Sequence, residues 1–248
     1  MNMLLSTPHA TLHATLSMID DELRSWALAE GSAEESYSVL IDAATLGRAG
    51  YPDAFPHLLM APAVMRDPAQ PFSEANMLAT HWCLSPAVCY HTYAGLEGQT
   101  LDPGVMVTAR GHCFRNEDPK ALEPGRRQVE FQMREIVLVG GSAWVEECVR
   151  ELQPGVEALA RAQGLGGAWC PANDPFFLPR ARGQAHMQRL LGTKIEWCLP
   201  DGLAVASINR HGAFFGDRFQ IRDARGTPAH SACIAFGLDR WAANQKTL

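Results

Sequence analysis

Residues 129–139 read VEFQMREIVLV, and this stretch decides the fold. Its apolar side chains recur at a period of two, which predicts a β-strand with one apolar face. Upstream, Val105 and Val107 alternate in the same way, and a charged stretch with two prolines and a glycine follows from Asn116 to Arg127. The pattern predicts two antiparallel strands joined by a long charged loop.

Helices and further strands are predicted on either side of this pair. Apolar residues at spacings of three and four between Leu12 and Trp26 indicate a helix over the first 30 residues, ended by Gly31. Another helix begins near Ser142, and we expect Pro154 to kink or split it. The other predicted elements are loop or short turns at 47–62, strands at 203–209, 218–221 and 229–236, and a helix at 238–244. Because strands and helices do not alternate, the predicted fold class is α+β, an antiparallel β-sheet flanked by helices.

The composition of the 248-residue chain is that of an ordinary globular protein, with 47% hydrophobic and 19% charged residues. We expect one domain over residues 1–248. The formal net charge of −6 argues against a dedicated nucleic-acid binder, because such proteins usually present a basic surface. The sequence has no apolar run of membrane-spanning length and no basic start typical of a signal peptide, so we expect a cytoplasmic location and no membrane partner.

The chain has seven cysteines, an odd number at wide spacing. A chain of this length folds without disulfides, so we predict reduced cysteines, most of them small buried residues. Spacing alone does not say which of them are metal ligands or nucleophiles.

Glu135 lies on the apolar face of the predicted strand 129–139. A buried carboxylate there costs on the order of several kcal/mol unless it is paired or binds a metal. Two interpretations stay open at this point: an ordinary environment, meaning a salt bridge to Arg134 or Arg150 or a strand that faces solvent, and a metal ligand.

Arg115 and Glu117 are two positions apart on the preceding strand and share a face. An arginine fork can hold a phosphate, and a nearby carboxylate can accept an amine proton, so the pair is suited to the two ends of a nucleotide. A surface ion pair is the alternative.

Two longer segments resemble motifs of class II aminoacyl-tRNA synthetases. Residues 113–117 (CFRNE), the charged loop and residues 131–137 (FQMREIV) resemble motif 2. Residues 233–240 (CIAFGLDR) resemble motif 3, although Asp239 stands where that motif usually has Glu. The resemblance implies the class II catalytic core as the fold.

The resemblance is closer to one branch of this superfamily. Residues 134–137 followed by Gly140, with Cys89 upstream and Cys233 downstream, resemble the zinc-dependent seryl-tRNA synthetases of methanogens and, more closely, the amino acid:[carrier protein] ligases. The other similar segments are 50–59, 86–90, 172–177 and 207–211, so the resemblance runs from about Gly47 to Ala243.

The family implies an ATP site built from four of these residues. Arg115 would grip the α-phosphate and Arg240 the γ-phosphate, as the catalytic pair. Glu117 would accept from the adenine amine, and Phe131 would stack on the ring. Mg²⁺ would bridge the phosphates.

The family also implies a zinc site and an amino acid beside it. Cys89, Glu135 and Cys233 would bind Zn²⁺ and leave one tetrahedral position for the substrate's amino group. Cys83, six residues before Cys89, is the alternative ligand. The family places Glu135, Ser207 and Asn209 at the substrate; for the last two, polar caps of a strand end are the alternative.

The implied function is ATP-dependent activation of a small amino acid of the Gly, Ala or Ser type as aminoacyl-adenylate, followed by transfer to the phosphopantetheine thiol of a carrier protein. The alternatives are a small-molecule acceptor, or a non-catalytic paralogue that binds amino acid and regulates a partner. The basic stretch Arg180, Arg182, Arg189 and Lys194 would receive the acidic carrier protein or form a solvated helix face.

The expected organisation is a helical N-terminal segment, 1–46, before a synthetase-like core, 47–248. We expect no tRNA-binding domain, because so little of the chain lies outside the core. The family also implies a homodimer, although we find no motif 1, which usually builds that interface.

Overall fold

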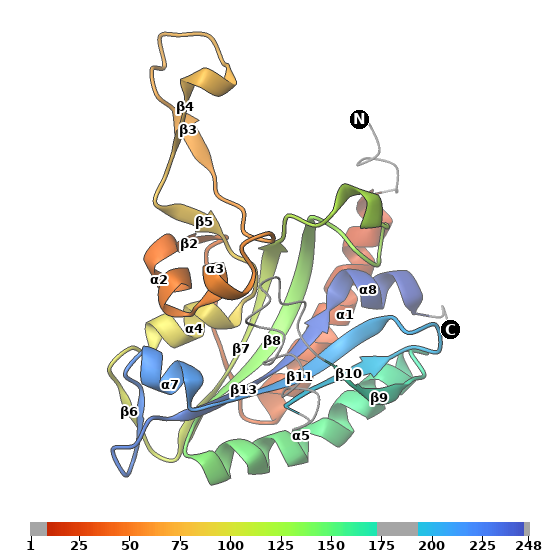
Figure 1. Cartoon of the computed structure of the whole chain (residues 1–248). Coiled ribbons are helices and arrows are strands. Elements are labelled where there is room, and N and C mark those ends of the chain that lie inside the picture. The colour runs from red at the N-terminus through yellow and green to blue at the C-terminus, as the bar shows by residue number, and fades with distance from the viewer. Residues whose placement is uncertain (1–8, 173–192, 246–248) are drawn as a thin grey trace.

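The alternating valines build a sheet at the centre of the fold. In residues 9–172 and 193–245, which the computed structural model describes, this sheet has seven strands in the order β1-β7-β8-β13-β11-β10-β9. Their bounds are β1 (Ala33–Glu34), β7 (Gly104–Phe114), β8 (Glu130–Gly140), β9 (Ala168–Pro171), β10 (Lys194–Cys198), β11 (Ala204–Gly212) and β13 (His230–Gly237). Only β1 pairs in parallel, with β7, so the predicted α+β class with an antiparallel sheet is confirmed (Figure 1).

Strands β7 and β8 are the predicted hairpin, with the charged loop between them. Their register places Ala109 opposite Glu135. The loop contains the 3₁₀ turn η2 (Pro119–Ala121). β11 and β13 correspond to two further predicted strands, and helix α8 (Leu238–Asn244) to the predicted last helix.

The strand predicted at 218–221 is wrong. Helix α7 (Phe214–Arg218) occupies the start of this segment, and Phe215 and Phe219, four positions apart, are both buried on its inner side. Gln220 then takes a left-handed conformation with φ of 56°, which turns the chain. Only β12 (Arg222–Asp223) is extended, and it pairs with β6 (Thr100–Leu101).

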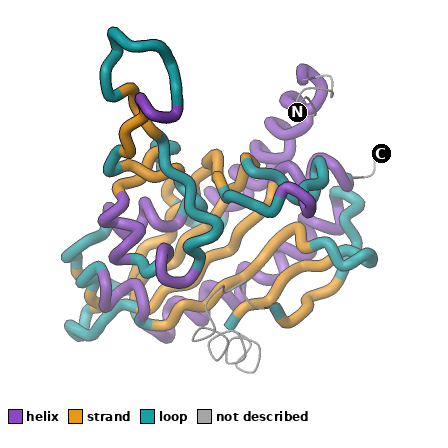
Figure 2. Tube along the Cα trace, turned by 45° about the horizontal axis from the view of Figure 1, so that its top comes forward, coloured by secondary structure: helices purple, strands orange, loops and turns teal. Residues whose placement is uncertain are grey.

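One face of the sheet is covered by α1 (His9–Ala29), α5 (Ser142–Ala162) and α8 (Figure 1, Figure 2). Their apolar sides form one core with the even-numbered residues of β8, such as Ile136 and Leu138. Helix α5 runs through Pro154 without interruption, contrary to the predicted kink or split. Pro154 is exposed, and burial of its neighbours Leu152 and Val156 outweighs the hydrogen bond that proline removes.

The other face carries short elements. They are β2 (Leu40–Asp42), α2 (Ala43–Arg48), α3 (Tyr51–Ala54), β5 (Trp82–Leu84), α4 (Cys89–Gly95) and α7. A two-stranded arm, β3 (Ala63–Met65) and β4 (Met77–Ala79) with η1 (Glu74–Asn76), projects from this side (Figure 1). The odd-numbered residues of β8 point to this face, where Val137 and Val139 pack with residues of α4 and α7.

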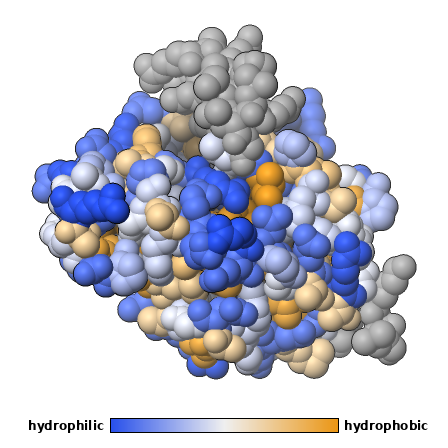
Figure 3. All heavy atoms as spheres, turned by 90° about the horizontal axis from the view of Figure 1, so that it is seen from below, coloured by the Kyte–Doolittle hydropathy of each residue, from blue (hydrophilic) through white to orange (hydrophobic). Residues whose placement is uncertain are grey.

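One face of the molecule shows how polar and apolar side chains are distributed on the surface. Seen from below, hydrophilic side chains dominate and apolar ones are scattered among them (Figure 3). Among the described helices, none has the length and apolar character needed to cross a bilayer.

Candidate active site

A cavity of about 950 Å³ opens on the face of the sheet that carries the short helices. It is lined by the ends of α2, α3 and α4, by the central strands β8, β11 and β13, and by α7 and α8. All nine residues that the sequence nominates for the site line it: Cys89, Arg115, Glu117, Phe131, Glu135, Ser207, Asn209, Cys233 and Arg240.

Three buried side chains meet at one end of the cavity. Cys89 is the first residue of α4, Glu135 lies in the middle of β8, and Cys233 lies on the adjacent strand β13. The two sulfurs and a carboxylate oxygen lie within 4.8 Å of one another. Within residues 9–172 and 193–245, no other group of three or more His, Cys, Asp or Glu side chains is arranged in this way.

Local folding explains this convergence. Adjacent residues of a strand point to opposite faces, so Glu135 shares the cavity face with Val137, which is opposite Cys233 in the β8–β13 ladder. The backbone N–H of Cys89, one of the four unpaired donors at the start of α4, donates to a Glu135 carboxylate oxygen at 2.8 Å. The helix start therefore stabilises the buried carboxylate.

The electrostatics of the three groups are coupled. Burial, with Cys233 beside it, raises the pKa of Glu135 to about 8. A hydrogen bond from Cys89 lowers the pKa of Cys233 well below its ordinary value, and the same contact, burial and Glu135 raise the pKa of Cys89. Three groups that become anionic thus share a space with little water, which is the environment that a bound cation stabilises.

The donor set fits zinc. Two sulfurs and one carboxylate oxygen are borderline-soft ligands, and three protein ligands leave a tetrahedral ion one open position. Cys83, the alternative ligand, is buried elsewhere, in a cluster with Ile41 and Leu46. It is not part of the three-residue group.

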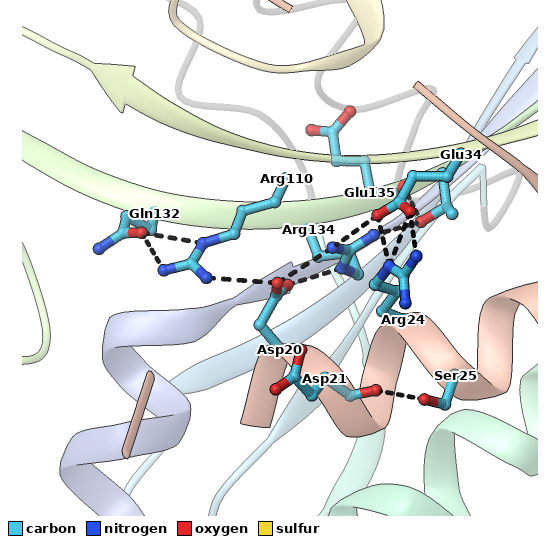
Figure 4. A network of polar contacts seen from close by, with 10 residues as sticks. Asp20, Asp21, Arg24, Ser25, Glu34, Arg110, Gln132, Arg134 and Glu135 are labelled. Atoms are coloured by element: carbon cyan, nitrogen blue, oxygen red, sulfur yellow. Dashed lines mark hydrogen bonds and ion pairs between the residues drawn. The ribbon is translucent and has the colours of Figure 1, made fainter. Parts of the chain in front are cut away.

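The ordinary environment considered for Glu135 is absent. Glu135 is only 2% exposed, so the strand does not face solvent at this position. Arg134 points to the opposite side of the strand, where its Nε donates to Asp20 at 2.6 Å, and Figure 4 shows the Glu135 carboxylate directed away from it. Arg150 pairs with Glu147 on the surface of α5.

Arginines and an aromatic ring line the other end of the cavity. The Arg115 guanidinium carbon lies 4.9 Å from the centre of the Phe131 ring, and its Nε and Nη2 donate to the Pro86 carbonyl at 3.2 and 3.0 Å. Glu117 pairs with Arg127 at 2.8 Å.

Arg240 is anchored by backbone oxygens. Its Nε donates to the Arg126 carbonyl at 2.8 Å and its Nη1 to the Ala204 carbonyl at 2.7 Å. Burial lowers its pKa, and so does the neighbouring Arg115. An anion such as a phosphate would relieve this repulsion.

Comparisons with known proteins identify the family. The chain is 31% identical over 231 residues to "Amino acid--[acyl-carrier-protein] ligase 1" of Bradyrhizobium diazoefficiens. The match covers 86% of this chain and 70% of that relative. The chain belongs to the amino acid--[acyl-carrier-protein] ligase family. A second ligase of the same organism is 32% identical over 222 residues, 82% of this chain and 66% of the relative. The chain thus spans about two thirds of the length of these relatives.

The type-2 serine--tRNA ligase of Methanocaldococcus jannaschii is a more distant relative, 28% identical over 64% of this chain and 33% of that protein. No protein-family profile matches the chain.

Solved structures confirm the class II core. Seryl-tRNA synthetase of M. kandleri, solved in complex with A. aeolicus tRNASec, superposes with a TM-score of 0.75 at 21% identity, over 92% of this chain and 51% of that one. Prolyl-tRNA synthetase of Giardia lamblia, with prolyl-adenylate, gives 0.70 at 13% identity, over 96% and 46%. At these identities the likeness concerns the fold alone.

The two other residues that the sequence resemblance places at the substrate lie on β11. Asn209 is opposite Cys233 and Ser207 is opposite Ala235, so both project into the cavity from the middle of the strand, not from a capped strand end. The Asn209 side-chain nitrogen lies 3.5 Å from the Cys233 sulfur and 3.2 Å from the Ser207 hydroxyl.

The basic stretch predicted to receive the carrier protein is only partly described. Arg180, Arg182 and Arg189 lie outside the described residues, as do residues 173–177 of one similar segment. Lys194 begins β10, its side chain is 13% exposed, and it pairs with Glu196 at 3.3 Å in the cavity. The solvated helix face considered for Lys194 is therefore wrong, because this residue belongs to a strand that faces the cavity.

Some cavity residues were not singled out from the sequence. Arg126 and Arg127 lie at the end of the charged loop and line the cavity, and their signal in the sequence is two adjacent arginines shortly before β8. His211 lines it as well, in the segment 207–211 that resembles the family.

Proposed function

We propose that this chain activates a small amino acid with ATP and transfers the resulting aminoacyl group to the phosphopantetheine thiol of a carrier protein. One observation carries the proposal: a single cavity joins the Cys89–Glu135–Cys233 group to the arginines and ring at its other end. Membership of the ligase family supports a carrier protein as acceptor.

The amino acid would occupy the end with the three buried ligands. Zn²⁺ held by Cys89, Glu135 and Cys233 would take the substrate's α-amino group at its open position, which selects a free amine. The cavity floor beside this group is made by Ala235 and Ser207, which are opposite one another on β13 and β11. Short side chains on the floor and the position of Asn209 favour a small substrate.

The nucleotide would occupy the other end. Arg115 and Arg240 would bind the phosphates, with Arg127 near Glu117 at the adenine side. The amino acid carboxylate oxygen attacks the α-phosphorus, the bond to the bridging oxygen breaks, and pyrophosphate leaves; the arginines contribute positioning and charge neutralisation. Mg²⁺ bound between the phosphates would neutralise further charge.

The position of Arg115 bears on Phe131. The guanidinium already covers one face of the ring. Adenine would therefore stack on the opposite face, or Arg115 would leave the ring when it binds the α-phosphate.

The second step transfers the aminoacyl group. The thiol sulfur attacks the adenylate's carbonyl carbon, the carbon–oxygen bond to AMP breaks, and the thiol proton passes to solvent. A homodimer, a cytoplasmic location and the lack of a tRNA substrate remain predictions.

The decisive experiment is amino-acid-dependent ATP–pyrophosphate exchange over all twenty amino acids, with metal content recorded on the same sample. We expect exchange with one or two small amino acids and about one zinc per chain. Absence of exchange from folded, zinc-loaded protein would contradict the proposal and favour the non-catalytic paralogue.

The acceptor is tested separately. The enzyme, ATP and the active amino acid are incubated with carrier proteins with and without phosphopantetheine, and intact mass is measured. We expect an added aminoacyl mass on a phosphopantetheinylated carrier only. Exchange without transfer to any carrier in the panel would favour a small-molecule acceptor.

A further inference from the structure

A second layer of polar side chains lies behind the Cys89–Glu135–Cys233 group, and His211 is at its centre. The His211 Nε2 atom lies 3.9 Å from the Cys233 sulfur. Its Nδ1 atom lies 3.3 Å from the Tyr93 hydroxyl and 3.3 Å from the Ser231 hydroxyl. The imidazole therefore bridges one of the three ligands and two buried hydroxyls.

The periodicity of the elements produces this second layer. Tyr93 is four positions after Cys89 on α4, so both point from the same side of the helix. Ser231 is two positions before Cys233 on β13, so both share a strand face. Helix α4 and strand β13 thus each supply a cysteine and also a hydroxyl, one helical turn away on α4 and two residues away on β13.

β11 places the imidazole between these two hydroxyls. The pairing of β11 with β13 is irregular between Arg210 and Gly212, so His211 sits at a bulge. Bulges redirect a side chain and are frequent next to active sites. The Phe215 ring, 4.9 Å away at an interplanar angle of 72°, packs against the imidazole.

We propose that His211 is a positioning residue of the metal centre: its Nε2–H donates to the Cys233 sulfur, while the Tyr93 hydroxyl, with the Ser231 hydroxyl beside it, donates to Nδ1. The inference rests on the proposed zinc site and adds to it a residue that controls one ligand.

Hydrogen-bond chemistry fixes the direction of the contacts. A metal-bound cysteine is a thiolate and accepts hydrogen bonds only. A neutral imidazole has one N–H, so when Nε2 donates to the thiolate, Nδ1 must accept. The Tyr93 side chain is fully buried, and Nδ1 is an acceptor within its reach.

The two cysteines have different hydrogen-bond environments. Cys233 has two side-chain nitrogens near its sulfur, His211 Nε2 at 3.9 Å and Asn209 Nδ2 at 3.5 Å. These contacts orient the Cys233 sulfur and withdraw charge from it. Residues behind metal ligands typically contribute 10–100-fold to metal affinity.

The test compares His211→Phe with His211→Gln. Phenylalanine keeps an aromatic ring against Phe215 and removes both nitrogens, whereas the glutamine amide can restore a donor near the Nε2 position. Zinc affinity is measured by competition with a chromophoric chelator, and the absorption spectrum of the Co²⁺-substituted protein reports on the sulfur ligands.

We expect His211→Phe to weaken zinc binding by about 10–100-fold. The sulfur-to-cobalt charge-transfer band should move to longer wavelength, because the sulfur lone pairs lose a hydrogen bond. His211→Gln should recover most of both effects. His230→Phe is the matched control, since His230 precedes Ser231 on β13 and points to the other face of the sheet.

Unchanged zinc affinity and an unchanged cobalt spectrum in His211→Phe would overturn the inference. If that variant does not fold, Tyr93→Phe carries the test, because it removes nothing but a hydroxyl that faces Nδ1. We expect Tyr93→Phe to weaken zinc binding and to shift the charge-transfer band in the same direction, and no change in either would overturn the inference. Wild-type protein that binds neither metal would reject the zinc site itself, a result distinct from loss of the His211 effect alone.

Discussion

At the scale of single residues, burial gives Cys89, Glu135 and Cys233 their chemistry. Each belongs to a different element, and either cysteine by itself would be an ordinary small core residue. Together they place two sulfurs and a carboxylate close to one another at a buried position. Replacing one member therefore removes one of the three proposed ligands and also changes the charge balance of the other two.

Replacing Cys233 by serine should abolish stoichiometric zinc binding and lower ATP–pyrophosphate exchange by at least about 100-fold, because a hydroxyl is a poor ligand for zinc. Metal analysis and the exchange assay on the same sample check this. Cys83→Ser is the matched control: it alters a buried cysteine outside the group and should keep its zinc. Zinc and exchange that both survive in Cys233→Ser would contradict the metal assignment.

Replacing Arg115 by alanine should distinguish the role of the phosphate end of the cavity from that of the metal end. Loss of a cation that meets developing charge on the α-phosphate should lower exchange by about 10²–10³-fold, while zinc content stays at the wild-type level. Arg225→Ala, which changes an exposed arginine after β12, should alter neither. Full exchange activity in Arg115→Ala would refute the assignment of Arg115 to the phosphate site.

At the scale of elements, the two faces of one strand determine the plan of the molecule. Even-numbered residues of β8 enter the core under α1 and α5, and odd-numbered ones face the cavity and the short helices. Helix α5 also depends on which of its sides is buried. Its buried side keeps residues 142–162 helical, although Pro154 predicts a kink or a break. Pro154 therefore still lowers the free energy of unfolding of the protein.

Replacing Pro154 by alanine should stabilise the protein. Pro154 is exposed, so alanine leaves no cavity, and it restores a backbone donor in the helix interior. Since proline costs about 3 kcal/mol in a helix interior, we expect the free energy of unfolding to rise by about 1–3 kcal/mol. Urea denaturation followed by circular dichroism measures this, and a loss of stability would show that α5 requires the proline.

At the scale of the whole molecule, buried ion pairs fasten α1 to the sheet behind the cavity (Figure 4). Asp20 of α1 accepts from the Arg134 Nε at 2.6 Å and Nη2 at 3.0 Å, and Arg110 reaches the same carboxylate at 3.3 Å. A more exposed pair, Arg24 with Glu34 of β1 at 2.7 Å, also joins α1 to the sheet. Arg134 neighbours Glu135 on β8, so this network lies directly behind the cavity floor.

Replacing Asp20 by alanine should destabilise the protein by about 3–5 kcal/mol, because Arg134 becomes a buried charge without its main partner. The double variant Asp20→Ala with Arg134→Met should recover much of the loss. Asp21→Ala, one position along and exposed, should change stability by no more than about 0.5 kcal/mol. Equal stabilities for Asp20→Ala and Asp21→Ala in urea denaturation would contradict the role of the buried pair.

The sequence by itself determined the features that depend on local pattern. The alternation along 129–139 identified β8, the motif resemblance identified the family, and the apolar spacing from Leu12 to Trp26 identified α1. A period of two or of 3.6 records which side of an element is buried, so it survives without knowledge of the partner.

Only the tertiary structure decided which residues meet. Cys89 and Glu135 lie 46 positions apart, and their contact depends on where α4 docks and on the register of β8 with β13. The same holds for His211 behind Cys233, for the arginines of the charged loop and for the partner of Arg134. These are long-range contacts set by strand register and helix docking, and a one-residue change of register would turn the same side chains to the other face.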